Sequence, residues 1–393
     1  QVISLKSLRL GVFVCRWRPS QAVTWPLKLE LFAIDRALNQ RSAVVYVTKP
    51  GRSAAIGRGR RHRMPQASRP GDLQGVQIPA VGRDVTTIVQ WRGRAVAGTL
   101  ADGLWERVRS GEASADGAPA TTWRRLMLDG QDGFKLDRRI NRLTVGPEGA
   151  LWVATARGLG RIDASGHVRR YGIADGLPAS DVHSVWVSPS KTKRLRAVIG
   201  TARGAVLLMR DGELTPLGGK QGLPVRAVWD ITRTQDGALW LASSWGVYRW
   251  HKGAVRRFSV ATGDLRNDWV TALTSHGNNV FVGTYCGGVS ELRTNTGHEK
   301  ITQATATGAR SQGTYVSHWW GGQHINLGGL RVVQGTLWAA TMEGALRATL
   351  GSESAVTLQP ESTVRGNVTA IVPDSRVEGR HQRMLFGTRA GIH

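Results

Sequence analysis

Several charged side chains beyond residue 150 are of types that could bind or transform a substrate. Arg157 and Arg203 occupy equivalent positions in two similar segments, and together they could clamp a carboxylate or sulfate through paired hydrogen bonds. Asp181 could form an acid/base pair with Asp268 or with Glu343 if the fold brings the carboxyl groups together. For the two arginines, a plain surface position in a basic protein is the simpler interpretation.

Two adjacent tryptophans stand in the stretch His318–His324, which we interpret as part of a long Gly-rich loop. Adjacent tryptophans in such a loop are hard to bury together, so Trp319 or Trp320 could stack on a sugar ring or another apolar ligand. The alternative is that one of them plugs a channel or covers the edge of a sheet. His183 lies inside an apolar run, which indicates a hydrogen-bonded core residue and not a ligand.

Motifs of common enzyme classes are missing from the sequence. It contains no nucleophile elbow G-x-S-x-G, no H-E-x-x-H pair, no Walker loop and no convincing dinucleotide fingerprint. Cys15 and Cys286 are the only cysteines, and they match no metal-ligand spacing. We therefore predict no metal site, no cofactor and no catalytic residues.

The composition is strongly basic and rich in glycine. Lys and Arg number 53 against 28 Asp and Glu, a net charge of +25, which would normally suggest nucleic acid or an anionic surface as the partner. Much of the excess lies near the N-terminus, where the cluster Arg58–Arg63 is more simply a solvated tail than a nucleic-acid site. The 49 glycines punctuate many short apolar runs, which argues for tight turns and against a helical bundle.

One unit recurs along the chain, with the pattern φ-W-φ-A/G-T-x-x-G-φ, where φ is aliphatic. The clearest copies are Leu151–Leu159, Leu239–Val247 and Leu337–Ala345. The Thr or Ser that anchors each copy stands at positions 99, 155, 201, 243, 284, 341 and 388. The mean spacing of about 48 residues is typical of a four-stranded propeller blade.

The residue types of this unit suit a blade. The Trp offers a large area to bury between neighbouring sheets, and the Ala or Gly before the anchor keeps the volume small where strands approach. The anchor hydroxyl can satisfy a backbone group of the turn, and the following Gly tolerates positive φ. We therefore predict an all-β fold, a seven-bladed β-propeller of four-stranded antiparallel blades, over residues 73–393.

Residues 1–72 contain no copy of the unit, and we predict a poorly structured basic segment that need not belong to the native fold. Val44–Thr48 is a candidate strand within it. The last copy ends close to His393, so the last blade must borrow a strand to avoid an open edge, unless the natural chain is longer. Leu73–Val81 is the candidate for that strand.

The connectors that enter each inner strand and the T-x-x-G turns should open onto one face around a central channel, where propeller ligands commonly bind. The residues predicted to bind a ligand there include the two loop tryptophans. The full set is Arg157, Asp181, Arg203, Arg226, Trp245, Asp268, Trp269, Tyr285, Trp319, Trp320, His324, Glu343 and Arg389.

The repeated units resemble the two-component regulator propeller repeat, which occurs in the extracytoplasmic ligand sensors of bacterial hybrid histidine kinases. The lead-in Asp175–Val185 is similar to that family's connector between strands, and Gln221–Pro224 echoes it. The chain departs from the family at Ser243, which replaces the anchor Thr, and at Gly287–Gly288, which widens one turn. The resemblance implies a ligand-binding sensor that recognises an oligosaccharide or similar small ligand, located in the periplasm or outside the cell. It also implies a histidine kinase output domain as partner.

Three alternatives remain open from the sequence. One is a propeller lyase or hydrolase similar in architecture to streptogramin lyases, although no matching His-rich metal constellation is present. Another is a protein-interaction scaffold, and the third and least favoured is nucleic-acid binding. The sequence leaves open whether the chain forms a homodimer.

Overall fold

The computed structural model divides into two compact units, Gln1–Gln74 and Gly75–His393, which are described separately. It describes residues 5–9, 12–15, 27–34, 40–47, 84–113, 119–126, 137–190, 193–217, 223, 226–294, 314–320, 323–351, 358–374 and 383–393.

The N-terminal unit contains two antiparallel hairpins. Strand β1 (Leu5–Arg9) pairs with β2 (Val12–Cys15), and β3 (Leu27–Ile34) pairs with β4 (Gln40–Val47). The candidate strand at Val44–Thr48 thus falls within and just beyond β4. The basic stretch 51–70 and the segment Leu73–Val81, predicted to supply a borrowed strand, lie outside the described residues.

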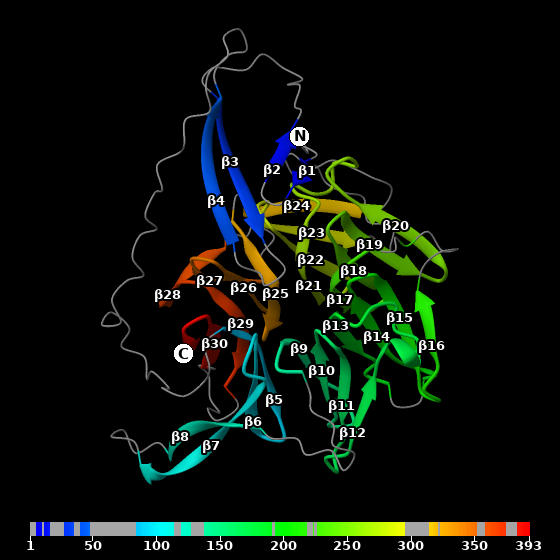
Figure 1. Cartoon of the computed structure of the whole chain (residues 1–393), viewed down its shortest axis with the longest axis vertical. Helices are drawn as coiled ribbons and strands as arrows, with labels where there is room; N and C mark the ends of the chain where they lie inside the picture. Colours follow the sequence, from blue (N-terminus) through cyan, green and yellow to red (C-terminus); the bar gives the residue numbers. More distant parts are fainter. Residues whose placement is uncertain are drawn as a thin grey trace. The chain divides into compact units, whose positions relative to one another are not determined.

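The second unit is the predicted seven-bladed propeller (Figure 1). Its first three blades are β5 (Val85–Trp91), β6 (Arg94–Thr99), β7 (Leu104–Ala113) and β8 (Pro119–Arg125); β9 (Ile140–Val145), β10 (Leu151–Thr155), β11 (Gly158–Ile162) and β12 (Val168–Tyr171); and β13 (Val182–Val187), β14 (Leu195–Thr201), β15 (Gly204–Met209) and β16 (Leu214–Leu217).

The fourth and fifth blades are β17 (Val228–Arg233), β18 (Leu239–Ser243), β19 (Gly246–His251) and β20 (Ala254–Phe258), then β21 (Val270–His276), β22 (Asn279–Thr284), β23 (Val289–Thr294) and β24 (Thr314–Trp320). The sixth is β25 (Ile325–Val333), β26 (Thr336–Thr341), β27 (Gly344–Thr349) and β28 (Gln359–Arg365). In its described part the seventh has three strands, β29 (Val368–Pro373), β30 (Met384–Thr388) and β31 (Gly391–Ile392).

The anchor residue has the same role in every blade. Its hydroxyl donates to the carbonyl of the turn glycine over 2.8–3.3 Å and accepts a backbone N–H of the turn over 2.9–3.2 Å. Ser243 makes both bonds, so the change from Thr to Ser preserves the turn. The glycines of the turns accordingly have positive φ, for example +124° at Gly158.

The repeated tryptophans are buried between adjoining blades, as the pattern predicted. Trp152 packs against residues of the third blade such as Val182, and Trp240 packs against residues of the fifth such as Val270. Trp338 contacts Phe386 of the seventh blade with ring centroids 5.9 Å apart. Each tryptophan therefore fills the interface with the blade that follows it.

The ring closes through its innermost strands, since each contacts the next and β29 contacts β5. Each of these strands is irregular just after its first residue, as between Val85 and Thr87 in β5. In five blades a side chain at this irregularity donates to the carbonyl of the first residue in the next innermost strand. These donors are Thr86, Asn141, Thr271, Asn326 and Thr369, and their acceptors are Ile140, Val182, Ile325, Val368 and Val85.

Candidate functional site

The T-x-x-G turns and the incoming connectors are hydrogen-bonded to one another, so they share one face of the propeller. Gly246 N–H donates to Asp268 O over 2.7 Å, and Tyr285 N–H donates to Trp269 O over 2.9 Å. Both bonds join a turn to the connector of the fifth blade. Residues of neighbouring blades are thereby brought together around the mouth of the channel.

Arg226 and Trp245 form a stacked pair on this mouth face. The guanidinium carbon of Arg226 lies 3.4 Å from the centroid of the Trp245 ring, a cation–π contact. Trp245 is 45% exposed, and among the described residues it is the only exposed Trp, Tyr or Phe. This pair therefore offers a planar surface to a ligand.

Asp268 contacts residues next to this pair. Its Oδ1 accepts the backbone N–H of Val260 over 2.7 Å, and its Oδ2 lies 3.8 Å from the Arg257 guanidinium. Arg257 in turn donates to the carbonyl of Trp245 over 2.7 Å. Val260 is itself 39% exposed, so an apolar side chain, a carboxylate and two guanidinium groups surround the Trp245 turn.

Trp269, Tyr285 and His324 form an aromatic cluster from the fifth and sixth blades. The Trp269 and Tyr285 rings are stacked with centroids 4.8 Å apart, and His324 meets Tyr285 edge-on at 4.3 Å. Burial lowers the pKa of His324 from 6.5 to about 4, so its imidazole is neutral at pH 7. The indole Nε1 of Trp269 is buried and has no hydrogen-bond partner in the described part of the chain.

Asp181 is held by its own neighbours. Asn141 Nδ2 donates to Asp181 Oδ1 over 2.8 Å, and Asp181 Oδ2 lies 3.5 Å from His183 Nε2. Burial raises the pKa of Asp181, but the interactions with His183 and Asn141 outweigh it and hold the pKa below its usual value. The His183 ring stacks on the Trp229 ring of the next blade, with centroids 4.4 Å apart. In five other pairs of adjoining blades, a hydrogen bond between the innermost strands makes the corresponding connection.

The remaining predicted residues lie at four different turns of the propeller. Arg157, Arg203, Glu343 and Arg389 are exposed at their turns. Arg157 lies 3.9 Å from Asp137, and Arg389 lies 3.9 Å from Asp84. Clamping of an anion by Arg157 and Arg203, and acid/base pairing of Asp181 with Asp268 or Glu343, stay predictions.

The placement of Trp319 and Trp320 in a loop was wrong. Both belong to strand β24, the outer strand of the fifth blade, and Trp320 pairs with Val289 of β23. The run Thr314–Trp320 is rich in β-branched and aromatic residues, which favour a strand over a loop. Their side chains lie outside the described residues, so a stacking role for them stays a prediction.

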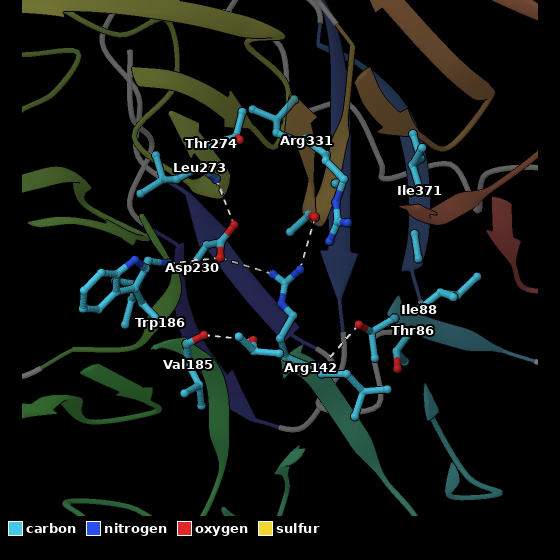
Figure 2. Close-up of a pocket in the computed structure, with 18 of the residues that line it drawn as sticks. Thr86, Ile88, Arg142, Val185, Trp186, Asp230, Leu273, Thr274, Arg331 and Ile371 are labelled. Carbon is cyan, nitrogen blue, oxygen red and sulfur yellow. Dashed lines mark hydrogen bonds and ion pairs between the residues drawn. The ribbon is translucent and has the colours of Figure 1, made fainter. Parts of the chain in front are cut away.

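The sequence did not reveal a second site, inside the channel (Figure 2). A cavity of about 290 Å³ is lined by residues from the innermost strands of all seven blades. Arg142 of β9 extends across it, with Nη2 3.4 Å from Asp230 Oδ1 of β17 and Nη1 donating to Gly328 O of β25 over 3.1 Å. Arg142 therefore links the second, fourth and sixth blades.

The signal for these residues lies in the register. In each blade an Ala or Gly precedes the anchor, and in six blades this small residue pairs with a residue of the innermost strand. The innermost-strand residue is small in four of these blades (Thr87, Ser184, Ala272 and Ala370) and charged in the other two (Arg142 and Asp230). A charged side chain at this otherwise small position could have been noticed once the repeats were aligned. Burial raises the pKa of Asp230, with Arg142 acting in the opposite direction.

The described residues contain no cluster of three or more His, Cys, Asp or Glu side chains suited to a metal ion. Nor does any helix among them have the length and apolar character required to cross a membrane.

The fold is similar to that of bacterial sensor domains. No family model and no curated protein sequence matches the chain. Two similar solved structures are extracellular domains of putative hybrid two-component systems from B. thetaiotaomicron. The identities are 19% and 15%, the TM-scores 0.57 and 0.58, and the alignments cover 81% and 80% of this chain. This chain spans only 40% of the length of either. The resemblance predicted from the repeats is thereby confirmed for the fold.

A third similar structure is PorZ, a surface component of the type-IX secretion system of Porphyromonas gingivalis. It is 12% identical with a TM-score of 0.50, and the alignment covers 79% of this chain and 36% of that one. At these identities the likeness concerns the fold alone.

Proposed function

We propose that this propeller is the ligand-sensing module of a bacterial signal-transduction protein and that it binds an extracytoplasmic oligosaccharide, or a similar small ligand, on its mouth face. The observation that carries the proposal is the exposed Trp245 ring beside Arg226. An exposed indole beside a guanidinium offers a ligand both an apolar face and charged donors.

The chemistry around Trp245 suits a sugar. An aromatic face packs against the C–H face of a pyranose ring, while hydroxyl groups need charged or polar partners at its edge. Arg226, Arg257 and Asp268 supply donors and acceptors at that edge. The arrangement therefore suits binding and orientation of a ligand.

The signalling part of the proposal is supported by the similar solved domains, which belong to hybrid two-component systems. In such an arrangement the occupied propeller would report to a histidine kinase output domain across a membrane. The proposed location is accordingly the periplasm or the cell exterior. No cofactor is required for binding of this kind.

Calorimetric titration with a panel of oligosaccharides tests the proposal. We expect at least one saturable ligand, whose affinity falls about tenfold or more in Trp245→Ala, since a stacked aromatic anchor is worth roughly 1–3 kcal/mol. Val145→Ala is the matched control, because Val145 is an exposed apolar residue at the far end of β9. Equal loss of affinity in both variants, or no ligand in the panel, would contradict the proposal.

A further inference from the structure

The channel cavity carries an uncompensated positive charge. Of the residues that line it, Arg142, Arg331 and Asp230 are the ones with ionisable side chains. The described lining thus supplies two guanidinium groups and one carboxylate. Charges removed from water are normally paired, because an isolated ion in the protein interior loses its hydration without gaining a partner.

Arg142 is fixed in place by its partners. Besides its contact with Asp230, it donates to the carbonyl of Gly328, which lies in an irregular stretch of β25. Gly328 has φ +59°, and a Cβ atom there would lie 1.6 Å from Arg142 Nη1. Glycine at this position is therefore what allows the guanidinium of Arg142 to reach across the channel.

Asp230 is already engaged and cannot neutralise a second cation well. Its Oδ2 accepts the backbone N–H of Leu273 over 2.9 Å, and its Oδ1 accepts that of Ile231 over 3.0 Å while facing Arg142. Both carboxylate oxygens are thus used on the side of the fourth and fifth blades. The remaining positive charge belongs to Arg331.

Arg331 has no hydrogen bond or ion pair with any described residue. Figure 2 shows its guanidinium group directed into the channel from β25, toward the side on which Arg142 lies. Burial and the neighbouring charge of Arg142 lower the pKa of Arg331, while the charge of Asp230 acts in the opposite direction to a smaller extent. Because a guanidinium stays protonated in proteins, this partly buried side chain is a cation with its donors directed at the cavity.

We propose that the channel binds a small anion with a carboxylate, sulfate or phosphate group, held by the Arg331 guanidinium and facing that of Arg142. Planar guanidinium groups bind such oxyanions through paired N–H donors. The cavity of about 290 Å³ is large enough for an oxyanion or small organic acid with ordered water, since water takes about 30 Å³ per molecule. This site is separate from the mouth face around Trp245.

Thermal unfolding of the whole chain tests the proposal with sulfate, phosphate and acetate as probes, against chloride at equal ionic strength. For at least one probe we expect a saturable rise in Tm of about 2 °C at ten times its Kd. Arg331→Gln should abolish the rise. Lys252→Gln, which removes a positive charge from the exposed β19–β20 turn, should retain it.

Two further readouts keep the test decisive. Without added anion, Arg331→Gln should be more stable than the wild type, because an unpaired, partly buried charge has been removed. In crystals of the wild type soaked in selenate, the anomalous signal should lie in the channel beside Arg331. A Tm rise that persists in Arg331→Gln, no saturable rise with any probe, or selenate only at the surface would overturn the proposal.

Discussion

Arg107 of β7 and Asp374, directly after β29, form a buried ion pair that joins the first blade to the last. The two guanidinium nitrogens Nη2 and Nη1 lie 2.7 and 3.2 Å from the two carboxylate oxygens, and both side chains are 4% exposed. Gln90 Nε2 adds a hydrogen bond to Pro373 O over 2.7 Å. The seam of the ring is thus held by charged and polar side chains, in addition to the contacts between strands β5 and β29.

Removal of one member of this pair should destabilise the propeller strongly. Arg107→Ala should lower the free energy of unfolding by about 3–5 kcal/mol, because the carboxylate of Asp374 would stay buried without a partner. Urea unfolding followed by tryptophan fluorescence measures the change.

The exposed ion pair of Arg194 with Glu213, 3.3 Å apart, provides the control. Arg194→Ala should cost less than about 1 kcal/mol. If the two variants lose similar stability, the seam does not depend on the buried pair.

The anchor hydroxyls should contribute measurably to stability. Thr155→Val keeps the shape of the side chain but removes its bonds with the Gly158 carbonyl and the Arg157 N–H, so we expect a loss of about 1–3 kcal/mol. Thr155→Ser should cost much less, because Ser243 makes the same two bonds in the fourth blade. Chemical denaturation of the two variants separates the hydroxyl from the methyl group, and a larger loss in Thr155→Ser than in Thr155→Val would show that packing of the methyl group matters more than the hydrogen bonds.

His324 should make the fold sensitive to acid. Its pKa is lowered from 6.5 to about 4 in the folded state, so the unfolded chain takes up a proton first as the pH falls. The stability that it contributes is complete above pH 6.5 and is lost toward pH 4, with an upper bound of about 3 kcal/mol.

The measurement is the free energy of unfolding from pH 7 to pH 4, for the wild type and for His324→Gln. The variant should lose less stability across this window. Burial also lowers the pKa of His393, so some slope should remain in the variant. Identical pH profiles would mean that the aromatic cluster does not exclude the charged imidazole.

The architecture was predictable because the repeat is encoded locally. Anchor, turn glycine and buried tryptophan lie within nine residues, as in Leu151–Leu159, and the bond between anchor and turn glycine follows from the geometry of one hairpin. The prediction that Trp319 and Trp320 lie in a loop was wrong because it relied on the glycines that follow them. The run Thr314–Trp320 itself has a strong preference for a strand.

The candidate sites were only partly predictable. Arg226 and Trp245 could both be named from their positions, but their stacking depends on how a connector and a turn meet in space. The contact of Arg142 with Asp230 joins blades that are not neighbours, so it depends on ring closure and on the register of each innermost strand. Local sequence patterns carry no information of that kind.

The central claim is that the mouth face binds a ligand without transforming it. Its most direct test incubates the chain with the ligand identified by titration and analyses the mixture by mass spectrometry alongside the binding isotherm. We predict saturable binding that depends on Trp245, with the ligand recovered intact after many times the binding lifetime. Cleavage or elimination products that form in proportion to protein and time would contradict the claim and favour the lyase or hydrolase alternative.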